Sequence, residues 1–111
     1  MVPYWDYPVP MRIVAIGILR EFWDAHPDAE HPLKAWVREA RAAQWKTPHE
    51  VKAQFRHASV LANRRIVFNI KGNDYRLVVA VDFEKGIVWI KWIGTHKAYD
   101  KIDVAEVRYG N

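Results

Sequence analysis

Three runs of β-branched and aromatic residues follow one another in the second half of the chain: RRIVFNI (64–70), YRLVVAVDF (75–83) and IVWIKWI (87–93). The links between them are short and contain glycine: KGND (71–74) and EKG (84–86). Short links of this kind between strand-forming runs are typical of β-hairpins. The sequence therefore predicts an antiparallel three-stranded meander, and other elements must cover at least one face of it.

Apolar residues in the first half recur at the three- and four-residue spacings of amphipathic helices. A short strand, MRIVA (11–15), precedes them. The first helix runs over ILREFWDAHP (18–27), a bend follows at DAEHPL (28–33), and the second helix runs from Pro32 to about Gln44. These two helices carry enough apolar side chains to cover one face of the sheet.

A third, short helix begins after Thr47. Thr47 is suited to the N-cap, Pro48 to the first turn, and Glu50 to the third position of a capping box. The order of elements is then β-α-α-(α)-β-β-β. This order predicts an α+β fold in which an N-terminal strand and two to three helices pack on one face of a mostly antiparallel sheet.

The 111 residues form one domain by length, with a net charge of +4 and no cysteine. The excess charge is concentrated in residues 64–101, which carry eight basic and four acidic side chains. Such a surface favours a polyanion such as nucleic acid as partner, or it is a mildly basic face in contact with solvent. No apolar run is long enough to cross a membrane, and the absence of cysteine favours the reducing cytoplasm.

Side-chain alternation divides each strand between two faces. Asn69, Arg76 and Lys91 belong to the more polar face, where Trp89 could stack on a base. Trp92 is assigned by the same alternation to the apolar face. The polar face is either a basic surface for nucleic acid or the solvent side of a two-layer fold.

Two motifs in this region carry a family resemblance. F-N-I-K-G-N-x-Y-R begins at Phe68 and G-T-H-x-x-Y-D begins at Gly94, with a hydrophobic strand between them. Together they resemble the HigB toxins of bacterial toxin–antitoxin pairs, within the RelE-like superfamily. The resemblance covers about residues 11–104 and is sharpest over 65–103. It leaves residues 1–10 as an N-terminal extension and 105–111 as a C-terminal tail.

The resemblance implies an activity and partners. HigB-type toxins are endoribonucleases that cleave mRNA, typically on the translating ribosome, and a helix-turn-helix antitoxin (HigA-like) neutralises them. They need no cofactor and act in the cytoplasm. The alternative is a non-catalytic, degenerate toxin that binds RNA or a protein without cutting.

RNA cleavage without a metal requires a base, an acid and positive charge at the phosphorane. His96 follows the third strand and suits proton transfer near neutral pH, although Thr95-His96 also fits a helix cap with an exposed histidine. Arg76 is the candidate for holding phosphate oxygens, and Lys71 and Lys91 for binding the backbone or assisting proton transfer. A lysine in a K-G-N-D turn also has the simpler explanation of solubility.

Further residues are expected to contact RNA without reacting. They are Asn69, Asn73, Trp89, Lys97 and Tyr99. Asn73 also suits the geometry of the turn, and Tyr99 the core. Asp100 could orient His96 or pair with Arg76, but an ion pair or cap is its simpler role.

The other histidines predict no metal site. His26, His31, His49 and His57 are scattered over predicted helices and loops, without metal-ligand spacing or an accompanying carboxylate cluster. Surface or capping roles account for them. A metal-dependent hydrolase is therefore the least favoured reading.

Overall fold

The computed structural model describes residues 10–107 and contains one five-stranded sheet. The strand order is β1-β5-β4-β3-β2, with β1 at Arg12–Val14, β2 at Ser59–Val60, β3 at Arg65–Ile70, β4 at Tyr75–Asp82 and β5 at Ile87–Thr95. β1 runs parallel to β5, and the other neighbours are antiparallel. The predicted meander is confirmed. β2 was not predicted, because two exposed residues carry too little pattern to be recognised.

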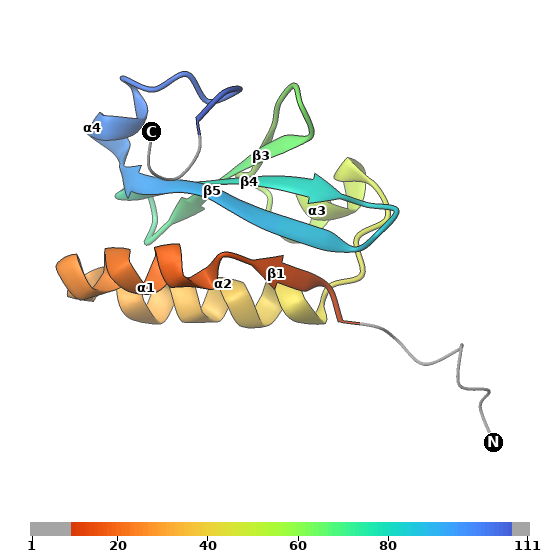
Figure 1. Cartoon of the computed structure of the whole chain (residues 1–111), viewed down its shortest axis with the longest axis horizontal. Coiled ribbons are helices and arrows are strands. Elements are labelled where there is room, and N and C mark those ends of the chain that lie inside the picture. Colours follow the sequence, from red (N-terminus) through yellow and green to blue (C-terminus); the bar gives the residue numbers. More distant parts are fainter. Residues whose placement is uncertain (1–9, 108–111) are drawn as a thin grey trace.

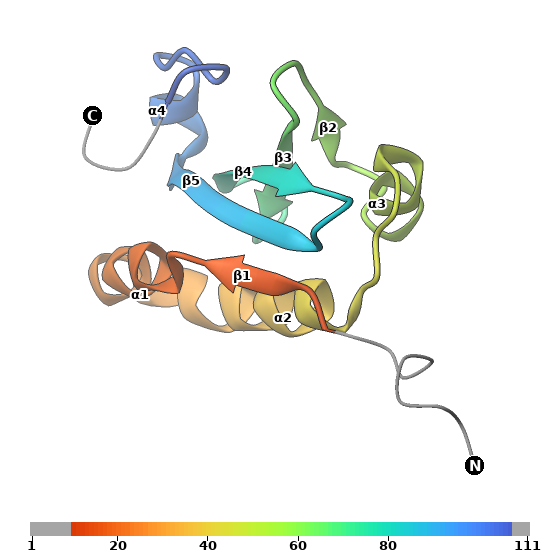
Figure 2. The same cartoon turned by 45° about the vertical axis from the view of Figure 1, so that its right-hand side comes forward.

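The helices lie mainly on one face of this sheet. They are α1 (Ile16–Ala25), the 3₁₀ turn η2 (Pro27–Ala29), α2 (Glu30–Ala42), α3 (Pro48–Gln54) and the short α4 (His96–Tyr99). Figure 1 shows α1 and α2 side by side beneath the strands, and Figure 2 shows the same layer from another side. The predicted α+β class is confirmed.

Packing between these layers forms the core. Leu19 of α1 and Leu33 of α2 are fully buried, as are Leu77 and Val79 of β4. Burial of aliphatic side chains of this size is worth about 1.5–3 kcal/mol each. The helical layer is thus attached to the face of the sheet opposite the one that Arg76 occupies, since strand neighbours alternate between faces.

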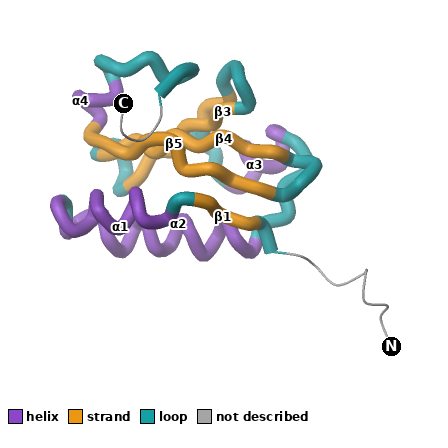
Figure 3. The backbone as a smooth tube through the Cα atoms, viewed as in Figure 1, coloured by secondary structure: helices purple, strands orange, loops and turns teal. Residues whose placement is uncertain are grey.

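The sequence placed the start of the second helix two residues too late. α2 begins at Glu30, directly after the turn at η2, and not at Pro32. Figure 3 shows α1 and α2 as helices beneath the strands. Proline is tolerated within the first turn of a helix, where its missing N–H has no intrahelical acceptor. At α3 the predicted capping box is present: the Glu50 backbone N–H donates to Thr47 Oγ1, and Thr47 N–H donates to Glu50 Oε1.

A β-bulge in β5 corrects the assignment of Trp92. Val78 pairs with Trp92 and Val79 with Ile90, so Lys91 is an extra residue opposite β4. Before the bulge Ile90 faces the core, and beyond it Ile93 does so. Trp92 therefore lies on the same face as Arg76 and not on the apolar face, because one inserted residue reverses the alternation.

The second face of the sheet is partly covered by the C-terminal segment. Arg65 is 8% exposed and donates from Nη1 to the carbonyl oxygen of Val104 at 3.1 Å and to that of Val107. In Figure 1 this segment runs above the strands, on the side away from α1 and α2. Val67 and Val78, which share this face, are buried. The face available to a ligand is accordingly narrower than an open sheet.

Candidate functional site

Polar side chains gather at the end of the sheet where the β3–β4 turn meets the end of β5. The register places Asn69 of β3 opposite Arg76 of β4, and Arg76 opposite Gly94 of β5. The backbone N–H of His96 donates to the carbonyl oxygen of Asp74 in the turn, at 3.0 Å. The two motifs of the sequence are thereby brought together at one edge of the fold.

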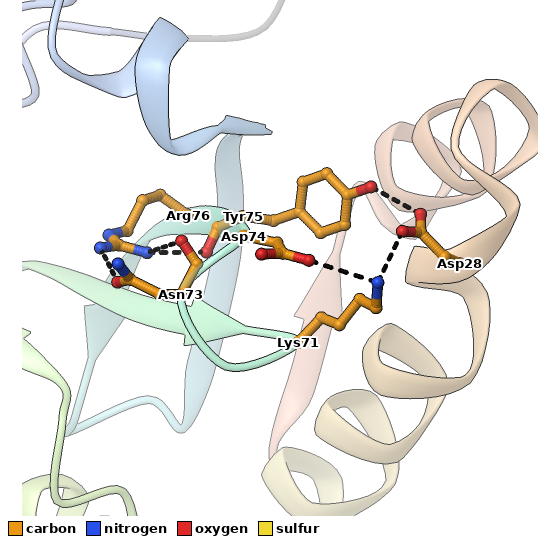
Figure 4. A network of polar contacts seen from close by, with 6 residues as sticks. All are labelled: Asp28, Lys71, Asn73, Asp74, Tyr75 and Arg76. Carbon is orange, nitrogen blue, oxygen red and sulfur yellow. Dashed lines mark hydrogen bonds and ion pairs between the residues drawn. The ribbon is translucent and has the colours of Figure 1, made fainter.

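Arg76 is held by the turn and keeps its charge free for an anion. Its Nη2 donates to Asn73 Oδ1 at 2.5 Å, and its Nη1 donates to the carbonyl oxygens of Asn73 and Tyr75 at 3.2 Å each (Figure 4). Within residues 10–107 it makes no ion pair with a carboxylate. Neutral oxygens orient the guanidinium without neutralising it, so a phosphate could still be its counter-ion.

His96 occupies the first position of α4. Thr95 caps this helix, because its Oγ1 accepts from the Ala98 N–H at 3.1 Å. The His96 side chain is 45% exposed, and its Nε2 lies 4.0 Å from Asp100 Oδ1. The helix cap and an accessible imidazole are therefore both present. The cap holds the start of α4, and with it the backbone of His96, in place.

An aromatic pair lies beside these groups. The rings of Trp92 and Tyr99 are 6.3 Å apart between centroids and tilted by 50°. Gly94 makes room for the indole, since a Cβ on this residue would lie 2.4 Å from the tip of the Trp92 ring. Trp92 was not among the site residues predicted from the sequence. The sequence of β5 alone does not mark the bulge, because the extra residue is defined only by the pairing with β4.

The remaining predicted residues are more scattered. Trp89 pairs with Ala80 and Val14, several residues along β5 from the aromatic pair. Lys91 is half-buried at the bulge, and Lys97 is exposed in α4. Neither lysine forms an ion pair with a carboxylate among residues 10–107. The structure thus places Arg76 and His96 at the same end of the sheet and Trp89 farther along β5.

Lys71 is occupied by two carboxylates. Its Nζ lies 2.8 Å from Asp28 and 3.2 Å from Asp74, and Tyr75 Oη donates to Asp28 at 2.5 Å. Hydrogen bonds to Asp28 and Asp74 raise the pKa of Lys71, while those from Lys71 and Tyr75 lower the pKa of Asp28. In Figure 4, Lys71 and Tyr75 point toward Asp28 and away from the Arg76 guanidinium. This geometry gives Lys71 an anchoring contact between the turn and η2, which favours structure over proton transfer.

The anchoring contact makes stability depend on pH. The pKa of Asp28 is lowered in the folded chain, so its contribution is present above about pH 4 and is lost as the pH falls through the folded value. Asp28→Asn is expected to lower the melting temperature at pH 7 and to flatten its decline between about pH 5 and pH 3. Melting curves across this range, with Asp24→Asn as control, measure the difference. An unchanged pH profile would contradict the anchor.

A pocket of about 360 Å³ adjoins Asn69. Its lining includes Phe55, Arg56, His57, Asn69 and Gly72. Arg56 and His57 are exposed and follow the end of α3. The sequence gave His57 a surface role and did not connect either residue to Asn69, because their proximity is a long-range product of the fold. A cation, an imidazole and an aromatic ring are groups that can contact the backbone and base of a nucleotide.

Metal-binding clusters and membrane-spanning helices are both absent from residues 10–107. No group of three or more histidine, aspartate or glutamate side chains is arranged there to hold a metal ion. No helix in that range has the length and apolarity to cross a membrane. The side chains that gather at the end of the sheet supply a guanidinium, an imidazole, amides and aromatic rings.

Comparisons with known proteins agree with the motifs. Residues 29–102 match a family described as HigB_toxin, RelE-like toxic component of a toxin-antitoxin system. The chain is 28% identical over 92 residues to the mRNA interferase toxin HigB of Escherichia coli (strain K12), covering 81% of this chain and 88% of that protein. The mRNA interferases HigB of Escherichia coli O157:H7 and of Shigella flexneri match with the same figures.

Proposed function

The chain belongs to the HigB toxin family, the RelE-like toxic components of toxin–antitoxin systems, and from this premise we propose that it is a metal-independent endoribonuclease that cleaves mRNA. Its relatives carry the name mRNA interferase. The substrate would be mRNA on the translating ribosome in the cytoplasm. A helix-turn-helix antitoxin of the HigA type would neutralise it.

The observation that carries the proposal is the state of Arg76. Its guanidinium is oriented by Asn73 and has no carboxylate partner among residues 10–107. Arg76 lies on the face of the sheet away from the helices. It pairs with Gly94 of β5, and Gly94 is two residues before His96 in the sequence. Arg76 thus offers an oriented cation on β4, and the neighbouring strand β5 leads into α4, where the His96 imidazole is accessible. Phosphodiester cleavage requires a cation and a proton-transfer group of these kinds.

In the proposed reaction the 2′-hydroxyl attacks the adjacent phosphorus. His96 takes the 2′-hydroxyl proton as the new P–O bond forms, and Arg76 stabilises the charge that develops on the non-bridging oxygens. The bond to the 5′-oxygen then breaks, and that oxygen receives a proton. Lys91 is the candidate donor, because Lys71 is engaged by Asp28 and Asp74. The products are a 2′,3′-cyclic phosphate and a free 5′-hydroxyl.

The neighbouring residues would position the RNA. Trp92 and Tyr99 offer ring faces for stacking, worth about 1–3 kcal/mol per base. Asn69, Asn73 and Lys97 lie within the same region to contact the backbone. Trp89 would meet a nucleotide farther along the strand, and the pocket with Arg56 and His57 would hold one beyond Asn69.

The proposal is tested by inducible expression in bacteria, with mapping of mRNA 5′ ends after induction. Wild type should create new ends within translated regions and arrest growth. His96→Ala should remove both while the protein stays soluble and folded, and His49→Ala, which alters an exposed histidine of α3, should leave both in place. New ends that persist in His96→Ala would reject the assigned base. Their absence with folded wild type would favour a non-catalytic binding module.

A further inference from the structure

A second surface feature lies on the helical layer, across the sheet from Arg76. It is a groove of about 810 Å³ between α1 and α2. Ile16 and Trp23 of α1 and Val37 of α2 form its apolar part, and these side chains are half-buried or buried. Over the stretch from Lys34 to Ala42 it is about 12 Å long, from the rise of an α-helix. This length accommodates a little over two turns of a third helix.

Three arginines border the apolar floor. Arg20 comes from α1, and Arg38 and Arg41 come from α2, and all three are exposed. None of them makes an ion pair with a carboxylate within residues 10–107. The fourth cation of the groove, Lys34, differs because it pairs with Glu30 at 2.5 Å and lies 5.4 Å above the ring of Trp23.

The residues that line the groove follow helical spacing along both α1 and α2. Ile16, Arg20 and Trp23 recur at four and three residues along α1, and Lys34, Arg38 and Arg41 do so along α2. Residues at such spacings share one face of a helix. Two parallel stripes with an apolar floor between them form the receiving surface for the apolar face of an amphipathic helix.

From this arrangement we propose that the α1–α2 groove docks an acidic amphipathic helix of the antitoxin. Leucine-like side chains would enter between Ile16, Trp23 and Val37, and flanking carboxylates would pair with Arg20, Arg38 and Arg41. The charge complementarity selects the partner, since uncompensated arginines around an apolar floor attract an acidic protein segment. The apolar floor favours a protein helix over RNA, whose backbone would leave that floor unfilled.

This inference rests on the proposed function, because the antitoxin is the partner of a toxin. It also makes a distinct claim. The groove and Arg76 lie on opposite faces of the sheet, so docking in the groove leaves the RNA-facing surface uncovered. The groove is an anchor that holds the antitoxin, separate from whatever part of the antitoxin suppresses cleavage.

The test is the double variant Arg38→Glu/Arg41→Glu, co-expressed with the cognate antitoxin and compared with wild type. We expect the affinity for the purified antitoxin to fall at least about tenfold by titration calorimetry. The melting temperature and the RNA cleavage by the toxin alone should stay unchanged. Lys85→Glu, which reverses an exposed charge in the β4–β5 turn, is the matched control and should bind as wild type.

Three results with the double variant would overturn the groove as the docking site. The first is that it binds the antitoxin with wild-type affinity. The second is that it loses binding of single-stranded RNA but keeps antitoxin binding, and the third is that the substitutions instead dissociate a dimer of this chain. The two proposals fail separately. Normal cleavage by wild type with an unaffected double variant rejects only the groove. If the wild type does not cleave RNA but its antitoxin binding depends on Arg38 and Arg41, only the proposed nuclease activity is rejected.

Discussion

Arg76→Ala is expected to lower the rate of RNA cleavage about 10²–10³-fold, the range seen when one oriented donor to a developing anion is removed. The change deletes the guanidinium that Asn73 orients from the turn, through Nη2–Oδ1 at 2.5 Å. Arg76 is half-buried and forms no ion pair within residues 10–107, so the fold loses little. The measurement is single-turnover cleavage of a translated mRNA in a reconstituted system.

Two further variants make this prediction specific. Arg76→Lys keeps the charge but loses the planar fork, and should recover only a small part of the rate. Arg64→Ala removes a guanidinium whose side chain is 73% exposed and which pairs with Asp82 at the end of β4. This variant should cleave as wild type. If Arg76→Ala cleaved at the wild-type rate with an unchanged melting temperature, the positive charge at the phosphorane would have to come from another residue.

Local pattern was enough to predict most of the fold. The hairpins followed from glycine-containing links, and Gly72 and Gly86 indeed take positive φ values. The capping box at Thr47 followed from the spacing of three residues. Turns and helix caps each involve only a few consecutive residues, so their backbone geometry can be predicted from the local sequence.

The bulge shows where pattern alone fails. Strict alternation assigned Trp92 to the core, and one inserted residue at Lys91 reversed that assignment for the rest of β5. The composition of the candidate site changed with it, because Trp92 joined Tyr99 and Gly94. Whether a strand accommodates an extra residue depends on its partner strand, and the sequence of β5 alone does not contain that information.

Contacts distant in sequence were equally out of reach. Lys71 pairs with Asp28, which is 43 residues away, and this contact favours an anchoring role for Lys71 in the β3–β4 turn over the predicted catalytic role. The pocket of Arg56 and His57 likewise adjoins Asn69 only after α3 packs beside β3. The roles of Arg76, His96, Lys71, Lys91 and the RNA-contacting residues stay predictions. Their positions in the fold now say which variants test them.

Phe68→Ala is expected to cost about 3–5 kcal/mol of unfolding free energy, the usual loss for removing a buried phenylalanine. Phe68 is 1% exposed, and its ring centroid lies 5.0–6.2 Å from those of Phe55, Trp36 and Trp45. It therefore joins β3 to α2, to the segment between α2 and α3, and to Phe55, which directly follows α3. Aromatic pairs contribute beyond their buried area, so the loss should fall in the upper part of this range.

The same substitution should affect the site, because Phe68 precedes Asn69 and lines the pocket beside it. Urea unfolding measures the free energy, and Phe83→Ala is the matched control, since that ring is only partly buried against the core. We expect Phe83→Ala to lose clearly less. Equal losses of unfolding free energy in the two variants would mean that the ring contacts of Phe68 with Trp36, Trp45 and Phe55 do not hold α3 on the sheet. A Phe68→Ala variant that remains folded is expected to bind RNA more weakly, because Phe68 forms part of the wall of the pocket that Asn69 also lines.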